Sequence, residues 1–148
     1  MPNHYHFLID ATVQSAEKIK LGAIEIGALS NGFRLLNSAY STCYNKKYNQ
    51  SGSVFRQKTK GKLIEQQSNK QDYPFICFQY IHQNPLKAKL VSKMEDWEFS
   101  SFRDYANLRD GTLVDKQKAY DLIDIDADNF YQQSYQIISE EMSRNIFE

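Results

Sequence analysis

Two histidines one residue apart lie in the segment MPNHYHFLID at the start of the sequence. In an extended strand alternate side chains share a face, so His4 and His6 would point to the same side. Two imidazoles on one face can hold a metal ion from a single element. The opposite face would then anchor the strand in a core through its apolar side chains, Tyr5, Phe7 and Ile9. The same pattern also arises by chance, with both histidines as ordinary polar residues.

A tyrosine and an asparagine in the segment YIHQNP are the second candidate for chemistry. Tyr80 and Asn84 are four residues apart, which on a helix puts them on one face, about 6 Å apart along the axis. A phenol with a pKa of about 10 is a poor nucleophile unless a cation lies close by. The two histidines and the Asn84 oxygen would hold a metal on a phosphate oxygen while Tyr80 attacks phosphorus. From spacing alone, a packed Tyr80 and a helix-ending Asn84 remain an alternative.

The segment before this tyrosine should contain one long helix. Apolar residues at three- and four-residue spacing predict a helix from Ser30 to about Tyr48, which ends at the sequence NQSGS. Residues 14–28 have a helical pattern interrupted by two glycines and give no clear prediction. The sequences SVFRQ and KGKLIE predict a hairpin, or a strand with an irregular continuation.

The tyrosine itself should lie on a second helix. Asp72 is the expected N-cap and Pro74 falls in the first turn. The helix is predicted to end near Asn84, because Pro85 pushes the preceding residue out of the helical region.

Downstream, two aromatic residues are expected to attach the next element to the core. Trp97 and Phe99 precede a short predicted helix that Ser100 or Ser101 would cap. Residues 116–148 are acidic and rich in tyrosine, and we predict that they are mainly helical.

The charge of the chain is neutral overall but strongly segregated. There are 18 basic and 18 acidic residues, yet residues 34–93 carry a local charge of +9 and residues 94–148 a charge of −8. Tyrosines and phenylalanines are interleaved with the basic residues, a mixture that suits phosphate contacts and base stacking. For any single residue there is an alternative: a lysine that only solvates a helix face, or a tyrosine that lies in the core. As a whole, the basic block favours nucleic-acid binding.

Length and composition predict one compact domain with a hydrophobic core, since 41% of the 148 residues are hydrophobic. No signal peptide is recognisable, and no segment approaches the roughly 20 apolar residues of a membrane helix. We therefore expect a cytoplasmic protein without a membrane partner. Cys43 and Cys77 are expected to be thiols that do not form a disulfide.

Four segments, in their order and separation, resemble the REP-associated tyrosine transposases, a group of insertion-sequence-type single-strand transposases in the HUH superfamily. They are MPNHYHFLI, SAYSTCYNKKYNQSGSVFRQ, YIHQNPLKAKLV and DWEFSSFRDY. The resemblance covers residues 1–107, which would form the catalytic domain, and leaves residues 108–148 as an acidic helical extension. The family's His-hydrophobic-His motif matches His4 and His6. Its nucleophile matches Tyr80, and its third metal ligand matches Asn84.

This resemblance implies an α+β fold, with a ferredoxin-like (RRM-like) antiparallel sheet, helices on one face and further helices at the C-terminus. It implies a homodimer that cuts and rejoins single-stranded DNA beside a hairpin, through a 5′-phosphotyrosine and a free 3′-hydroxyl. The expected cofactor is Mg²⁺ or Mn²⁺, although imidazole ligands suit softer ions and leave the metal open on chemical grounds. The basic residues after the predicted hairpin would contact the DNA backbone: Arg56, Lys58, Lys60 and Lys62.

The sequence departs from the family at its beginning. Relatives carry a strand, a helix and a strand before the histidine strand, so we expect an N-terminally incomplete domain here. A start codon assigned too late, a decayed element and a sheet completed by another chain would each explain this. The alternative function is a catalytically inactive, truncated remnant that binds nucleic acid. A replication initiator or relaxase shares the histidine and tyrosine chemistry, but the Tyr-x-x-x-Asn-Pro spacing and the small size argue against it.

Overall fold

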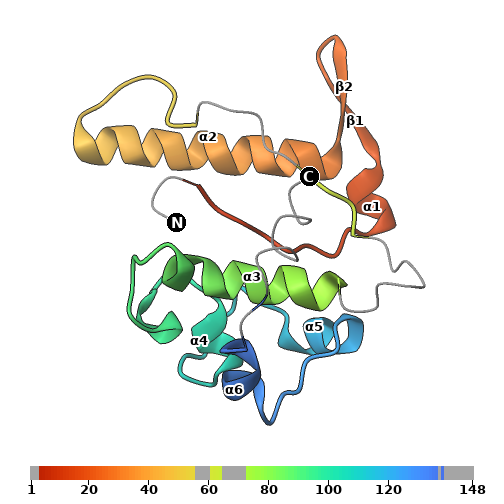
Figure 1. Ribbon diagram of the computed structural model, residues 1–148. Coiled ribbons are helices and arrows are strands. Elements are labelled where there is room, and N and C mark those ends of the chain that lie inside the picture. The colour runs from red at the N-terminus through yellow and green to blue at the C-terminus, as the bar shows by residue number, and fades with distance from the viewer. Residues whose placement is uncertain (1–3, 56–60, 65–72, 137, 139–148) are drawn as a thin grey trace. The chain divides into compact units, whose positions relative to one another are not determined.

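The computed structural model describes residues 4–55, 61–64, 73–136 and 138. Its elements, in chain order, are α1 (Val13–Ala16), β1 (Lys18–Leu21), β2 (Ile24–Gly27), α2 (Ala28–Tyr48), α3 (Tyr73–Lys87), the 3₁₀-helix η1 (Met94–Asp96), α4 (Phe102–Tyr105), α5 (Lys116–Leu122) and α6 (Phe130–Ser134) (Figure 1). Helices together with an antiparallel strand pair confirm the expected α+β class.

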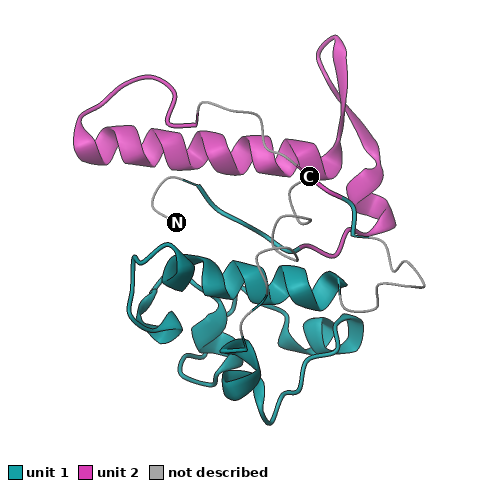
Figure 2. Cartoon of the chain, viewed as in Figure 1, with its two compact units in different colours: residues 1–8, 63–148 teal, residues 9–62 magenta. Residues whose placement is uncertain are grey.

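The chain divides into two compact units (Figure 2). The first comprises residues 1–8 and 63–148, and the second comprises residues 9–62. The histidine segment and the tyrosine helix thus belong to the same unit, although more than fifty residues of the second unit separate them in sequence. The boundary at residue 107 that the sequence suggests stays a prediction.

The strands of the second unit form a tight hairpin. Lys18 pairs with Gly27 and Leu21 with Ile24, so two residues make the turn. Gly22 lies in this turn with a φ of 62°, a left-handed conformation that glycine adopts without a steric penalty. Within the described residues this hairpin is the only sheet, and it lies in the stretch for which the sequence gives no clear prediction.

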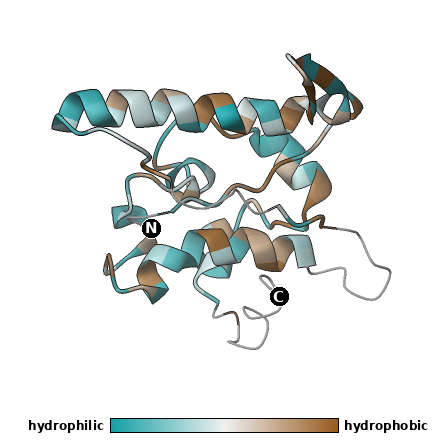
Figure 3. Ribbon diagram, turned by 90° about the horizontal axis from the view of Figure 1, so that it is seen from above, coloured by the Kyte–Doolittle hydropathy of each residue, from teal (hydrophilic) through white to brown (hydrophobic). Residues whose placement is uncertain are grey.

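Helix α2 confirms the predicted long helix. It begins two residues before the predicted Ser30 and ends at Tyr48, as the sequence NQSGS indicates. Asn49 then turns the chain in a left-handed conformation, and its backbone N–H donates to the carbonyl of Asn45. Hydrophobic and hydrophilic residues alternate along the helix (Figure 3), and none of its 21 residues is buried.

The hairpin predicted after α2 is not seen in the described residues. Residues 53–55 and 61–64 form no strand, and the intervening residues lie outside the described part of the chain. The larger ferredoxin-like sheet therefore remains an expectation from the resemblance.

Helix α3 corrects the predicted helix end. Pro74 falls in the first turn as expected, whereas Asp72 lies outside the described residues. The helix continues past Pro85 to Lys87, and Pro85 is buried inside it. The bias against helix before a proline is a local preference that packing can override. The end is formed later, where Lys89 adopts a φ of 57°.

The first unit has an aromatic core around α3. A single cluster joins this helix to the elements after it and consists of Phe78, Met94, Phe102, Tyr105, Ile123 and Phe130. Rings from α3, α4 and α6 meet edge to face or tilted within this cluster, at centroid distances between 4.9 and 6.1 Å. The acidic C-terminal segment thus contributes two of the six core side chains, Ile123 and Phe130.

The sequence predicts that the two aromatic residues before α4 attach the next element to the core, but the structure does not bury both of them. Phe99 is 83% exposed, and Trp97 is half-buried with its ring 5.7 Å from that of Phe99. Phe102 and Met94 occupy the core position instead. The N-cap of α4 is Ser101, one of the two residues expected, but its side chain makes no capping hydrogen bond. The Ser100 hydroxyl accepts a hydrogen bond from the Phe102 backbone N–H at 3.1 Å.

Residues 116–136 contain α5 and α6 and only partly confirm the predicted helical segment; residue 137 and residues 139–148 lie outside the description. The segment is fixed to α3, because the Gln83 side chain donates to the carbonyls of Ser134 and Gln136 at 2.9 and 2.7 Å. It is also fixed to η1, where Tyr135 donates to Glu95.

The structure bears on two further predictions, which concern the cysteines and membrane-spanning helices. Cys43 and Cys77 are not joined in a disulfide. No helix in the described part of the chain combines the length and the apolar character needed to cross a membrane.

Candidate active site

The histidine segment does not form the predicted strand. Residues 4–10 are assigned neither to a helix nor to a strand. The side chains expected to anchor this segment in the core are 36%, 49% and 46% exposed; they are Tyr5, Phe7 and Ile9.

The segment is attached through its other face. Leu8 packs against the aromatic core of the first unit, and His6, on the same side of the extended chain, is half-buried. Side chains of this segment thus alternate between two faces, as predicted, but the face that was expected to be exposed is the one that is buried. The reason is that the core of the first unit packs against the face that carries His6 and Leu8.

The structure brings one of the two histidines, His6, close to the tyrosine of α3. The ring centroids of His4 and His6 are 4.9 Å apart, with the planes nearly perpendicular. The His6 ring lies 5.9 Å from the Tyr80 ring in an edge-to-face arrangement. Both ring pairs lie within the first unit, so their proximity does not depend on how the two units are placed.

The helix supplies the other two functional groups. Tyr80 is half-buried, and Asn84, 9% exposed, lies one turn further along the same face of α3. Burial raises the pKa of the Tyr80 phenol above 10, and the Asn84 carboxamide opposes this shift. At neutral pH the phenol is therefore protonated and needs a cation to become a nucleophile.

The electrostatics of His6 suit cation binding. Burial lowers the pKa of His6 below 6.5, and the neighbouring His4 lowers it further. The neutral imidazole is the form that offers a lone pair to a metal. A ring separation of 4.9 Å between His4 and His6 is compatible with one shared ion, because metal–imidazole bonds are about 2.0–2.1 Å long.

Asn84 fits the role of an oxygen ligand. Its Nδ2 atom is buried, and a hydrogen bond from this side chain lowers the pKa of the Tyr80 phenol. The other atom of the amide, Oδ1, would be the donor atom for a cation. The described residues contain no group of three or more His, Cys, Asp and Glu side chains arranged to hold a metal.

His82 belongs to a different environment, as its position two residues after Tyr80 predicts. Its ring lies 4.5 Å from that of Phe78 and 5.9 Å from that of Phe130, inside the aromatic core. Its Nε2 atom is 2.8 Å from the Ser101 hydroxyl. Burial lowers the pKa of His82 to about 3, so this third histidine is neutral and structural.

The predicted DNA-contacting residues are only partly described. Arg56, Lys58 and Lys60 lie outside the described residues. Lys62 is exposed and belongs to the second unit. The structure therefore leaves the predicted backbone contacts as expectations.

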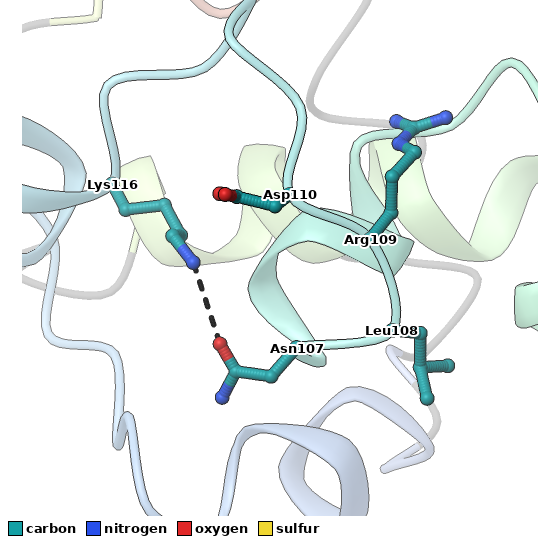
Figure 4. A pocket seen from close by; sticks show the side chains of 5 residues that line it. All are labelled: Asn107, Leu108, Arg109, Asp110 and Lys116. Atoms are coloured by element: carbon teal, nitrogen blue, oxygen red, sulfur yellow. Dashed lines mark hydrogen bonds between the residues drawn. The ribbon is translucent and has the colours of Figure 1, made fainter.

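A shallow hollow of about 360 Å³ lies elsewhere in the first unit (Figure 4). It is lined by Asn107, Leu108, Arg109, Asp110 and Lys116, and none of the predicted site residues takes part. Lys116 Nζ donates to Asn107 Oδ1 at 3.3 Å across it. Sequence reasoning missed this hollow, because no motif connects residues 107–110 with Lys116.

Comparisons with known proteins do not identify a family for this chain. It matches no protein-family model, and neither the comparison with curated proteins nor that with solved structures gives a match. A functional proposal must therefore be supported by the residues and their geometry.

Proposed function

We propose that this protein is a metal-dependent tyrosine transposase that cuts and rejoins single-stranded DNA beside a hairpin. The observation that carries the proposal is the proximity of His6 to Tyr80, a residue about seventy-five positions later, with His4 beside His6. Asn84, on the same helix face, completes the set of groups that this chemistry needs. The four-segment resemblance supports the same reaction.

In this reaction the Tyr80 phenolic oxygen attacks a DNA phosphorus. A tyrosine O–P bond forms, the bond from phosphorus to the 3′-oxygen breaks, and that oxygen takes a proton to leave a 3′-hydroxyl. The phenol loses its proton to solvent. A bound Mg²⁺ or Mn²⁺ would polarise the phosphate and stabilise the phenolate. Attack of a 3′-hydroxyl on the phosphotyrosine reverses the step and rejoins DNA without ATP.

The proposal also includes the type of sheet, the dimeric state and the residues that would hold the metal. An N-terminally incomplete ferredoxin-like sheet and a homodimer are what the resemblance implies. The metal would be held by His4, His6 and Asn84, which supply two nitrogen donors and one oxygen donor. Three protein ligands leave coordination positions for phosphate oxygens and water.

A covalent-adduct assay tests the function. An end-labelled single-stranded hairpin DNA is incubated with the protein and Mn²⁺ and analysed on a denaturing gel. We expect a protein–DNA adduct that EDTA and Tyr80→Phe each abolish. Tyr73→Phe is the matched control, because Tyr73 lies on α3 two turns before Tyr80 and on the same face. Persistence of the adduct in Tyr80→Phe would exclude Tyr80 as the nucleophile.

A second candidate is a non-catalytic protein that binds single-stranded nucleic acid. The +9 charge of residues 34–93 favours it. The raised pKa of Tyr80 is compatible with it, because it keeps the phenol protonated at neutral pH. This candidate predicts no adduct under any metal condition, together with binding that EDTA leaves unchanged. Adduct formation that depends on Mn²⁺ would exclude it.

A further inference from the structure

Helix α2 carries a ladder of tyrosines that the proposed reaction does not use. Tyr40, Tyr44 and Tyr48 recur every four residues, so their rings follow one side of the helix for about 12 Å. The Tyr40 and Tyr44 rings are stacked at a centroid distance of 6.0 Å, and those of Tyr44 and Tyr48 are 4.5 Å apart. The Phe55 ring, 5.6 Å from that of Tyr40, extends this ladder beyond the helix.

The ladder is accessible at both ends. Tyr40 is 53% exposed and Tyr48 is 52% exposed, whereas Tyr44 between them is half-buried. All the rings of the ladder belong to the second unit. Large tyrosine faces are therefore presented along a helix with no buried residue.

The charge around this ladder has a single sign. Residues 28–62 contain seven Lys and Arg residues and no Asp or Glu. Lys47 Nζ lies 5.4 Å from the centroid of the Tyr48 ring, so a cation stands directly beside the exposed end of the ladder. Aromatic rings in a segment that has basic residues and no acidic ones complement a chain of bases joined by phosphates.

We propose that the Tyr40–Tyr44–Tyr48 ladder of α2 binds single-stranded DNA by base stacking, with Lys46 and Lys47 on the phosphates. The identity of the ligand rests on the proposed function, but the contact itself needs neither metal nor Tyr80. Stacking requires exposed base faces, which a single strand offers and a duplex conceals. The ladder belongs to the second unit, whereas Tyr80 belongs to the first.

Fluorescence anisotropy tests this proposal on the full chain. The probe is a 5′-fluorescein-labelled (dT)₁₂ strand in EDTA at low salt, with unlabelled (dT)₁₂ and a 12-bp duplex as competitors. We expect Tyr48→Ala to weaken binding at least about fivefold, the lower end of the loss of one base–aromatic stack. Tyr48→Phe, which keeps the ring, should bind like the wild type. The duplex should compete poorly.

Leu35→Ala is the matched control. Leu35 is 53% exposed on the same helix, and nine residues place it about 180° around the axis from Tyr44. It should leave binding unchanged, and circular dichroism should show the same helix content in all variants. Unchanged binding in Tyr48→Ala, equal losses in Tyr48→Phe and Tyr48→Ala, or full competition by the duplex would overturn the proposal. Because the assay contains no metal, a failed adduct assay leaves its result unaffected.

Discussion

At the scale of single residues, one carboxylate organises the loop after α4. Asp104 is buried and accepts hydrogen bonds from the Arg109 guanidinium and from the Gly111 backbone N–H. The same guanidinium donates to the carbonyls of Glu98 and Ser100 at 2.8 and 2.9 Å. Gly111 is required here, since a Cβ at this position would lie 2.5 Å from Asp104 Oδ1.

Removal of the guanidinium should destabilise the first unit. Arg109→Ala leaves the buried Asp104 carboxylate without its cation and two carbonyls without their donor. Because Arg109 is partly exposed and water can replace some contacts, we expect a loss of about 2 kcal/mol in the free energy of unfolding. Arg109→Lys should recover part of it, since it restores the charge but not the planar fork. Urea denaturation followed by circular dichroism gives both values; equal stabilities of wild type and Arg109→Ala would contradict this role.

The same carboxylate predicts a dependence of stability on pH. The hydrogen bond from Arg109 lowers the pKa of Asp104 below its ordinary value, with help from the Gly111 N–H. A lowered pKa contributes stability that is complete above about pH 4 and is lost as pH falls through the folded-state value. The difference in unfolding free energy between wild type and Asp104→Asn should therefore shrink between pH 6 and pH 2. A difference that stays constant over this range would show that the ionised form is not favoured.

The three histidines allow a metal-binding test with an internal reference. NMR signals of the His4 and His6 ring protons should broaden at substoichiometric Mn²⁺, because paramagnetic broadening falls steeply with distance from the ion. The His82 signals should broaden least and can be recognised because, with a pKa of about 3, they do not move between pH 5 and pH 8. In His6→Ala the broadening of His4 should require more Mn²⁺. Equal broadening of all three histidines would contradict a site at the N-terminal pair.

At the scale of elements, the sequence indicates the end of one long helix but not that of the other. The end of α2 follows from asparagine and glycine in the sequence, and the structure has it where predicted. The end of α3 does not, because Pro85 is accommodated in a buried turn and the chain leaves the helix at Lys89, which has no sequence signal for a left-handed turn.

Lys89 offers a direct test of this helix end. At a φ of 57° a side chain is strained, whereas glycine is not. Lys89→Gly should therefore raise the free energy of unfolding by about 0.5–1 kcal/mol. Lys89→Ala is the control, because it removes the same side chain and keeps the Cβ, so it should give no such gain. Thermal denaturation distinguishes the two variants, and a gain of the same size in both would assign the effect to the lost charge instead.

At the scale of the whole molecule, the sequence predicted local geometry better than it predicted long-range packing. The four-residue spacing of Tyr80 and Asn84 follows from helix geometry, and the alternation of His4 and His6 follows from extended backbone. Which face of the histidine segment is buried depends on the aromatic core of α3, α4 and α6. Contacts in this core join residues more than fifty positions apart, such as Phe78 and Phe130, and leave no local pattern.

The proximity of the histidines to Tyr80 is likewise a long-range property. Sequence spacing alone could only suggest this proximity as a hypothesis. The family resemblance is what predicted that the histidines and Tyr80 belong to one site. The tyrosine ladder of α2 was visible as a basic, aromatic segment, but its ring contacts and exposure required coordinates.

Mapping the DNA attachment site by tandem mass spectrometry tests the central claim most directly. The protein is reacted with a single-stranded hairpin in Mn²⁺ and digested with nuclease and protease, so that a short nucleotide remnant stays on the attacking residue. The account predicts this remnant on Tyr80 alone among the ten tyrosines of the chain. A remnant on any other residue, or its complete absence with Mn²⁺ present, would contradict it.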